Sequence, residues 1–331
     1  MLITRTPVRI PLGGGGTDLP FYANEYGGFL ISAAINKYIY IIVNKHFEKN
    51  FRICYSKKEI VETADEIKHP VVHEAMKLLN IEGGIEVVSM SDVPSSTGLG
   101  TSSSFTVGMI NALSNYKKMN LTKYEMAELA VKIERELLAE PGGKQDQYIA
   151  SFGGICCMEF PPKSKEVVMS PLRISHNCVK KLEQNTYLFF TGLNRDSWQV
   201  QKDVGDTNKS DSDRLEAIES MHRIKEIGLE IKKALSSEDS DRFGNLLNEH
   251  WRVKKKLSRK ISNSWIDRIY NLAMENGALG GKLMGAGGGG YFMFYCKDNA
   301  QRLRDTMTNM ELEEMDFKFD FEGSKLVAWD D

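Results

Sequence analysis

Hydrophobic positions along the chain recur with two different spacings, which predict a mixture of strands and helices. Runs rich in β-branched and aromatic residues predict strands at residues 29–43, 51–55, 85–90, 155–160, 186–190 and 291–296. Apolar residues spaced three or four apart predict helices from residue 105 onward and over 122–138, 213–235, 239–258 and 265–275. Residues 59–79 also have helical character, which Pro70 interrupts. Because strands and helices do not alternate strictly, the pattern favours an α+β fold over a doubly wound sheet.

A chain of 331 residues is long enough for about two domains. The polar segment PPKSKE, residues 161–166, follows the predicted strand at 155–160. We therefore predict an N-terminal domain over residues 1–165 and a C-terminal domain over residues 166–331.

The composition is that of an ordinary globular protein, with 41% hydrophobic and 27% charged residues. The net charge of −2 disfavours nucleic acid as a partner, and the strongest basic run, residues 252–256, is interpreted as a solvent-facing helix surface. No apolar stretch approaches the ~20 residues of a membrane span, and the N-terminus lacks the apolar core of a signal peptide. Because the five cysteines are scattered and include no Cys-x-x-Cys pair, we expect no disulfide framework or zinc site and a cytoplasmic protein.

Three glycine-rich segments lie far apart in the chain, at residues 13–18, 98–104 and 285–290. The second lies within VPSSTGLGTSSSF and connects a predicted strand to a predicted helix. Bare backbone N–H groups at a helix start, with hydroxyl side chains around them, are typical of a phosphate site. The segment lacks the Gly-Lys-Ser/Thr ending of the common phosphate loop, so a nucleotide would be held in another way. Glycines also serve turns and bulges, but three such segments favour a nucleotide-binding enzyme.

The residues within these segments resemble the three signatures of the GHMP kinases, a family that includes galactokinase, homoserine kinase and mevalonate kinase. TPVRIPLGGGGTD at residues 6–18 resembles the first signature, Pro-Gly-Arg-Val-Asn-Leu-x-Gly-Glu-His-Thr-Asp. PSSTGLGTSSS at residues 94–104 resembles the second, and KLMGAGGGGYF at residues 282–292 resembles the third, Lys-x-Thr-Gly-Ala-Gly-x-Gly-Gly. The order and distances of the signatures fit, and together they span nearly the whole chain.

A further segment narrows the resemblance within the family. GGKQDQYIASFGG at residues 142–154 is similar to the Gly-Gly-x-Gln-Asp-Gln segment of bacterial heptose-phosphate kinases and fucokinase-like enzymes. Gly15 and Gly16 replace the Glu-His of galactokinase, which disfavours galactose as the substrate. Thr101 and Met284 stand where relatives often have serine and threonine, and neither change removes a backbone donor.

The resemblance implies the two-domain α+β fold of this family, with a mixed α/β N-terminal domain and a ferredoxin-like C-terminal domain. It also implies that ATP is bound with Mg²⁺, for which Ser102 and Glu134 are the expected ligands, since Mg²⁺ prefers oxygen ligands. The alternative for Glu134 is a solvated position on a helix. The residues implied for ATP binding are Pro94, Gly98, Leu99, Gly100, Thr101, Ser102, Ser103, Ser104, Gly285, Ala286 and Gly287.

The resemblance further implies catalytic and substrate-binding residues. Asp146 is the expected general base, and Arg9 is expected to steady both that carboxylate and the transferring phosphoryl group. From the residues alone, an aspartate in a glycine-rich turn is more often a cap. Lys144 is expected to contact a phosphate on the sugar, although Lys144 and Arg195 are alternatively exposed surface cations. The residues implied for substrate binding are Gly14, Gly15, Thr17, Asp18, Lys144, Gln145 and Arg195.

The implied activity is ATP-dependent phosphorylation of a heptose 7-phosphate at its anomeric hydroxyl. One alternative is a fucokinase-like or other anomeric kinase of an unphosphorylated sugar, and another is a non-catalytic sugar or nucleotide sensor with the same fold. The expected partners are therefore a sugar phosphate and ATP, without nucleic acid or membrane. The sequence does not fix the oligomeric state, and a homodimer is possible.

Overall fold

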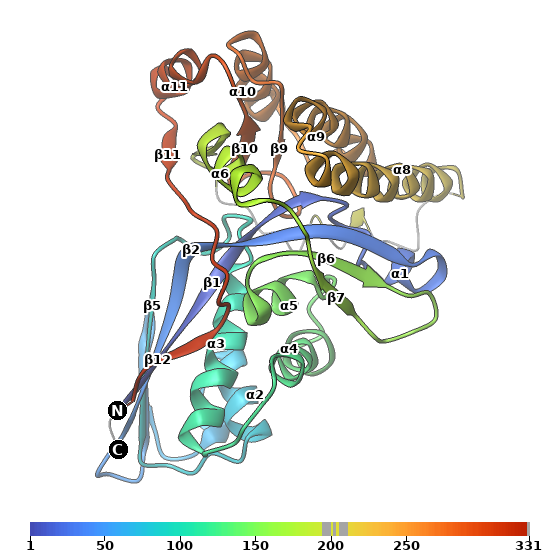
Figure 1. The fold of residues 1–331 in the computed structure, drawn as a ribbon. Coiled ribbons are helices and arrows are strands. Elements are labelled where there is room, and N and C mark those ends of the chain that lie inside the picture. Colours follow the sequence, from blue (N-terminus) through green and yellow to red (C-terminus); the bar gives the residue numbers. More distant parts are fainter. Residues whose placement is uncertain (194–199, 201–202, 205–210, 330–331) are drawn as a thin grey trace.

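The computed structural model describes residues 1–193, 200, 203–204 and 211–329. In this part of the chain, strands form two separate sheets, and helices pack against both (Figure 1). None of the described helices is both long enough and apolar enough to cross a membrane.

The larger sheet is built on two long N-terminal strands. Its strands are β1 (Leu2–Gly13), β2 (Gly28–Lys45), β3 (Phe51–Cys54), β4 (Lys58–Val61), β5 (Ile85–Ser91), β6 (Ile155–Phe160), β7 (Val168–Pro171) and β12 (Lys325–Trp329). They follow the order β12-β1-β2-β5-β3-β4, and β6 pairs with both β2 and β7. The β3–β5 pair is parallel and the other pairs are antiparallel. Beta-branched residues along β1 and β2 supply much of the core.

Helices cover this sheet from two sides (Figure 1). The helices of the N-terminal half are α1 (Pro20–Tyr26), α2 (Pro70–Leu78), α3 (Thr101–Tyr116), α4 (Lys123–Val131) and α5 (Gln145–Phe152). α3 packs on β1 and β2, and its residues Val107, Ile110 and Leu113 are fully buried. α8 (Asp211–Ser236) also contacts β1 and β2, and it lies on the opposite side of them in Figure 1. The long strands β1 and β2 are therefore enclosed between helices, which makes them a rigid base for side chains at their ends.

The smaller sheet comes from the C-terminal half. Its strands are β8 (Thr186–Phe190), β9 (Gly280–Leu283), β10 (Tyr291–Tyr295) and β11 (Glu313–Met315), in the antiparallel order β11-β8-β10-β9. The remaining helices are α6 (His176–Asn185), α9 (Ser240–Lys254), α10 (Ser264–Glu275) and α11 (Ala300–Asn309). Aromatic rings hold α9 to β10, since the Trp251 ring meets the Phe292 ring edge-on with centroids 5.6 Å apart.

Most predicted elements are confirmed, and β6 and β8 have the predicted bounds. The predicted capping box at the start of α4 is also present: Glu125 N–H donates to Thr122 Oγ1 at 3.2 Å, and Thr122 N–H donates to the Glu125 carboxylate at 2.7 Å. The helical prediction for 59–79 is wrong at residues 59–61, because residues 58–61 pair with β3 as strand β4, and before Pro70 only Ala64–Glu66 form a short 3-10 helix. Helix α2 starts at Pro70, where proline lacks only an N–H that a first turn leaves unpaired.

Several short elements were not predicted, among them α5 and β9. Residues 145–152 form α5, a helix that is flanked by Gly142–Gly143 and Gly153–Gly154 in the sequence. Residues 280–283 form β9, where small residues pair with β10 and pack under α9. Tertiary contacts rather than local propensity stabilise both short elements.

The predicted domain boundary at residue 165 lies between β6 and β7, which pair in the larger sheet. β12, near the end of the described chain, also joins that sheet through β1. Two strands from beyond residue 165 therefore belong to the larger sheet, and the division into 1–165 and 166–331 stays a prediction.

Candidate active site

The three glycine-rich segments converge between the two sheets. Gly98 has a φ of +80°, and a methyl group there would lie 2.6 Å from the carbonyl oxygen of Met284. Tyr291 N–H donates to the Thr97 carbonyl at 3.1 Å, which ties the second segment to the start of β10. Backbone meets backbone at this point, so only glycine fits at position 98.

The second segment ends in the N-terminus of α3. Gly100 is the N-cap with a left-handed φ of +77°, and Ser104 N–H donates to the Gly100 carbonyl at 3.0 Å. The N–H groups of residues 101–103 precede this first helical bond and have no acceptor within the helix. Together with the helix dipole, they form a site suited to a phosphate. The other predicted ATP residues of this segment, from Pro94 to Ser104, lie around this turn, with Leu99 and Ser104 buried.

Arg9 and Asp146 form a two-pronged ion pair next to this turn. Arg9 Nε lies 2.7 Å from Asp146 Oδ1, and Arg9 Nη2 lies 2.6 Å from Asp146 Oδ2. Arg9 Nη1 donates to the Gly98 carbonyl at 2.5 Å, and Arg9 N–H donates to the Leu99 carbonyl at 2.9 Å. The Arg9 side chain is 6% exposed and the Asp146 side chain 21% exposed, so the carboxylate is held firmly while one side stays accessible.

Asp18 lies beside this pair, at the start of the predicted sugar site. Its carboxylate accepts hydrogen bonds from Gln145 N–H at 3.1 Å and from Gln145 Nε2 at 3.2 Å. Burial raises the pKa of Asp18 above its ordinary value. Gly143 is required here, because a methyl group at that position would lie 1.9 Å from Asp18 Oδ2.

The other predicted residues of the first segment have different positions. Gly15 lines the cavity described below. Thr17 is fully buried, and its hydroxyl lies 2.8 Å from the Gly14 carbonyl oxygen and 2.9 Å from the Phe29 carbonyl oxygen. A methyl group at Gly14, whose φ is +73°, would lie 2.1 Å from the same Phe29 oxygen. Gly14 and Thr17 therefore hold the shape of the loop that presents Gly15 and Asp18.

Glu134 is buried, not solvated, and sits on a π-helical segment, residues Lys132–Leu137. Its Oε2 accepts hydrogen bonds from Ser103 Oγ at 2.9 Å and from Gln147 Nε2 at 2.6 Å. Burial raises the pKa of Glu134, and the nearby Arg135 opposes that shift. The structure thus brings Ser103, rather than the exposed Ser102, to this carboxylate. Glu134 Oε1 is buried without a hydrogen-bond partner among the described residues, so this oxygen is suited to bind a cation.

Lys144, one of the two predicted sugar-phosphate cations, is not brought into this group. Lys144 Nζ lies 3.0 Å from Glu128 Oε1 and 2.7 Å from the Lys165 carbonyl oxygen. Its side chain lines a neighbouring cavity beside α4 rather than the one that contains Asp146. Arg195 lies outside the described residues.

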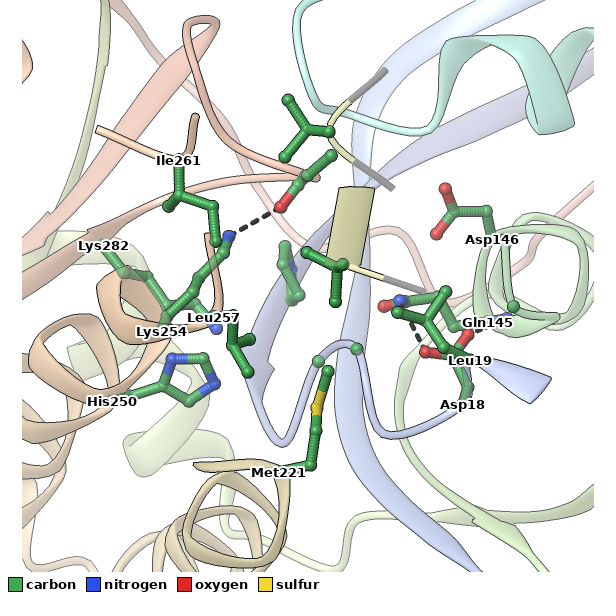
Figure 2. Close-up of a pocket in the computed structure, with 18 of the residues that line it drawn as sticks. Asp18, Leu19, Gln145, Asp146, Met221, His250, Lys254, Leu257, Ile261 and Lys282 are labelled. Atoms are coloured by element: carbon green, nitrogen blue, oxygen red, sulfur yellow. Dashed lines mark hydrogen bonds between the residues drawn. The ribbon is translucent and has the colours of Figure 1, made fainter. Parts of the chain in front are cut away.

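A cavity joins Asp18 and Asp146 to a cluster of basic residues that the sequence did not predict. Figure 2 shows Asp18, Gln145 and Asp146 on one side, and His250, Lys254 and Lys282 on the other. His250 and Lys254 lie one turn apart on α9, and Lys282 lies on the adjacent strand β9. The cavity is also lined by Gly285 and Ala286 of the third segment and by the apolar residues Leu19, Val200, Val204, Met221, Leu257 and Ile261.

The basic residues of this wall are held out of water. His250 and Lys282 are each 1% exposed. Burial, followed by the charge of Arg9, lowers the pKa of Lys254 to about 7. Burial and the neighbouring lysines lower the pKa of His250 well below its ordinary value, and burial does the same for Lys282. Two sequence signals could have found them: Lys282 opens the third signature, and His250 and Lys254 share a helix face at spacing i, i+4.

Comparison with known protein families agrees with this geometry. Residues 68–154 match the model of the GHMP kinases N terminal domain, and residues 231–311 match the model of the GHMP kinases C terminal domain. The first match contains α3, Glu134 and Asp146, and the second contains His250, Lys254 and Lys282. Asp146 and the basic residues of the cavity therefore come from the matched parts of the chain, whereas Arg9 and Asp18 precede the first match.

Individual relatives resemble the chain over its full length. It is 34% identical to D-glycero-alpha-D-manno-heptose 7-phosphate kinase of Campylobacter jejuni, covering 97% of each chain. It is 27% identical to the bifunctional fucokinase/GDP-fucose pyrophosphorylase of Arabidopsis thaliana, covering 92% of this chain and 30% of that longer protein. The crystal structure of a D-glycero-D-manno-heptose 1-phosphate kinase from Bacteroides thetaiotaomicron superposes with a TM-score of 0.83 at 27% identity, covering 100% of both chains. The chain therefore belongs to the GHMP kinase family and is a sugar kinase with the two-domain α+β fold of that family.

Proposed function

We propose that this kinase transfers the terminal phosphoryl group of ATP to the anomeric C1 hydroxyl of D-glycero-α-D-manno-heptose 7-phosphate, giving the 1,7-bisphosphate for nucleotide-activated heptose. The observation that carries the proposal is the Arg9–Asp146 pair, which lies between the phosphate-binding turn and the cavity containing Asp18. The 34% identity to a heptose 7-phosphate kinase supports the choice of acceptor.

The N-terminus of α3 and the third glycine-rich segment would hold the phosphates of ATP. The free N–H groups of residues 101–103 donate to phosphate oxygens, and Gly98 lets the Met284–Gly285 backbone approach. Glu134 with Ser102 or Ser103 would hold Mg²⁺, a fit supported by the unpartnered buried Oε1 of Glu134. When bound, Mg²⁺ neutralises charge on the phosphate oxygens.

Asp146 would act as the general base. Its carboxylate accepts the proton of the C1 hydroxyl while the C1 oxygen bonds to the γ-phosphorus and the bond from that phosphorus to the bridging oxygen of ADP breaks. Arg9 fixes the orientation of this carboxylate through two contacts. Asp18, oriented by Gln145, would accept hydrogen bonds from hydroxyls of the sugar.

The test is product identification. Purified enzyme is incubated with ATP, Mg²⁺ and the heptose 7-phosphate, and the product is examined by phosphorus NMR. We expect a second, anomeric phosphate coupled to the C1 proton and equimolar ADP. ADP release without a sugar product, or phosphorylation at another hydroxyl, would contradict the proposal.

A further inference from the structure

One wall of the active-site cavity carries buried basic groups that the phosphoryl transfer described above does not use. Lys282 is 1% exposed and makes no ion pair or side-chain hydrogen bond with the part of the chain that the structure describes. Both ring nitrogens of His250 are buried and have no hydrogen-bond partner among the described residues. Lys254 Nζ donates to the carbonyl oxygens of Leu283 at 3.0 Å and Gly285 at 2.6 Å, which leaves one of its three N–H groups free.

The fold places these groups together by close packing of α9 on β9. A methyl group at Gly280 would lie 1.9 Å from the Gly244 carbonyl oxygen, so the helix and strand are nearly in backbone contact. Burial lowers the pKa of both His250 and Lys282, and the charge of Lys254 lowers each of them further. Unpaired basic groups in a dry site carry a large cost unless a ligand compensates them.

The cavity is electrostatically divided. Among the described residues, the charged or titratable side chains that line it are Arg9, Asp18, Arg135, Asp146, His250, Lys254 and Lys282. Arg9 and Asp146 neutralise one another, and Arg135 pairs with Glu134 at 3.3 Å. Of these described side chains, one carboxylate remains without a cationic partner, that of Asp18. It lies on the opposite side of the cavity from His250, Lys254 and Lys282 (Figure 2).

The turn at residues 98–104 lies outside this cavity. None of residues 94–104, all of them described, lines it, and of the residues expected to hold ATP only Gly285 and Ala286 of the third segment do. The cavity thus extends from Asp146 to the basic wall. A sugar that fills it with its reacting hydroxyl at Asp146 has its other end at the basic wall.

We infer that Lys254, Lys282 and His250 form the binding site for the phosphate ester that the acceptor already carries. The inference rests on the proposed function, because it assigns the remote phosphate of the proposed acceptor. A phosphate ester brings about −1.5 to −2 of charge and several acceptor oxygens, which meet the free N–H groups of this wall. Lys144, the cation predicted from the sequence for this role, already contacts Glu128 and the Lys165 carbonyl.

The experiment compares Lys282→Met and Lys254→Met with the wild type. KM is measured for heptose 7-phosphate, for the unphosphorylated heptose and for ATP. We expect either variant to raise the KM of the sugar phosphate by about 10- to 100-fold, the value of one or two hydrogen bonds to a charged group. In Lys282→Met, the KM of ATP and the turnover of unphosphorylated heptose should stay at wild-type values. Lys254→Met also removes the hydrogen bonds to the Leu283 and Gly285 carbonyl oxygens beside the ATP segment, so Lys282→Met is the deciding variant for these two values. Lys255→Met is the matched control, because Lys255 is the next residue in the same basic run and pairs with Asp267 at 2.9 Å.

The outcomes separate the two claims. Calorimetric titration of inorganic phosphate and of heptose 7-phosphate without ATP measures anion binding independently of turnover. Binding that both lysine variants lose supports the inference, even if the wild type fails to phosphorylate this sugar and the proposed function falls. An equal loss of turnover with unphosphorylated heptose would overturn the inference, because the wall would then serve the transferring phosphoryl group. Unchanged KM values in both variants, or a rise confined to Lys144→Ala, would overturn it as well.

Discussion

At the scale of single side chains, the site depends on buried charges whose partners are fixed by the backbone. Arg9 is held by the Gly98 carbonyl and in turn holds Asp146, so the proposed general base cannot rotate freely. Asp18 and Glu134 are buried carboxylates whose pKa values burial raises, and both accept hydrogen bonds from neighbours on or near α5. Rotamers that are locked in this way reduce the reorganisation needed for transfer.

Replacement of the base tests its role directly. Asp146→Asn should bind ATP as the wild type does, because Asp146 lies outside the phosphate-binding turn. Turnover should fall by about 10²–10⁴, the usual contribution of general acid–base catalysis. Nucleotide binding by calorimetry and turnover by ADP release provide the two readouts. A folded variant with wild-type turnover would remove Asp146 from the mechanism.

The metal assignment makes a second prediction at this scale. Glu134→Gln, Ser102→Ala and Ser103→Ala each remove an oxygen from the expected surroundings of Mg²⁺, so the Mg²⁺ concentration for half-maximal rate should rise. Comparison of the two serine variants identifies the ligand, because Ser103 contacts Glu134 in this structure. Glu136→Gln is the control, since Glu136 is exposed on the same helical segment. Titration curves of all variants that overlay the wild type would exclude these ligands.

At the scale of elements, the site forms where segments of the chain come into close contact at glycine residues. Gly98 lies against the Met284 backbone, so the second and third glycine-rich segments are in direct contact. Gly143 lies against Asp18, so the turn before α5 is in direct contact with the first segment. Such contacts tolerate no side chain, which explains why glycine-rich segments so far apart in sequence belong to one site.

Gly98→Ala should therefore weaken ATP binding and lower the stability by more than about 1 kcal/mol. Gly192→Ala is a matched control, because Gly192 has a similar φ of +72° but no atom within 4 Å of an added methyl group. Both variants carry the cost of a positive φ, and only Gly98→Ala also pushes Met284 away. Urea unfolding and ATP titration measure the two effects. Equal losses in both variants would show that the contact between the segments is unimportant.

Sequence patterns identified the elements with strong periodicity and missed those defined by contacts. The capping box at Thr122 and the strand at 155–160 follow from local chemistry. Helix α5 was missed because its glycine flanks indicate a loop, whereas packing against α3 and α4 stabilises it. In the site, motif register brought Arg9 and Asp146 together correctly. Local patterns single out Lys282, His250 and Lys254, but their meeting in one cavity depends on how α9 packs on β9, a contact between segments distant in sequence.

At the scale of the whole molecule, the cavity lies between parts of the chain that are distant in sequence. β1 and α5 supply Arg9 and Asp146, whereas α9 and β9 supply the basic wall. The basic run that includes Lys254 and Lys255 was interpreted as a solvent-facing surface. Instead, Lys254 turns into the cavity while Lys255 pairs with Asp267.

The buried lysine makes the stability of the free enzyme depend on pH. The pKa of Lys254 falls from 10.5 to about 7 on folding, so above pH 7 the unfolded chain binds a proton that the folded chain does not. The free energy of unfolding should therefore rise with pH, by up to about 1.4 kcal/mol per unit from this group. The other basic groups that face the Lys254 ammonium are Arg9, His250 and Lys282. They are the same in wild type and in Lys254→Met, so the difference between the two proteins reports on Lys254.

Urea unfolding of wild type and Lys254→Met at pH 7, 8 and 9 measures this contribution. The wild type should gain stability relative to Lys254→Met as the pH rises. Lys255→Met should instead stay parallel to the wild type. A constant difference between wild type and Lys254→Met would contradict the buried, weakly basic state of Lys254.

We propose above that the enzyme is an anomeric kinase for a sugar that already carries a phosphate. The most direct test is the kcat/KM of the wild type for heptose 7-phosphate, unphosphorylated heptose, mannose and fucose, measured by ADP release under identical conditions. We expect the kcat/KM for heptose 7-phosphate to exceed the kcat/KM for every neutral sugar by about 10-fold or more, because the basic wall binds its phosphate. A higher kcat/KM for any neutral sugar would overturn the proposed substrate and favour a fucokinase-like activity.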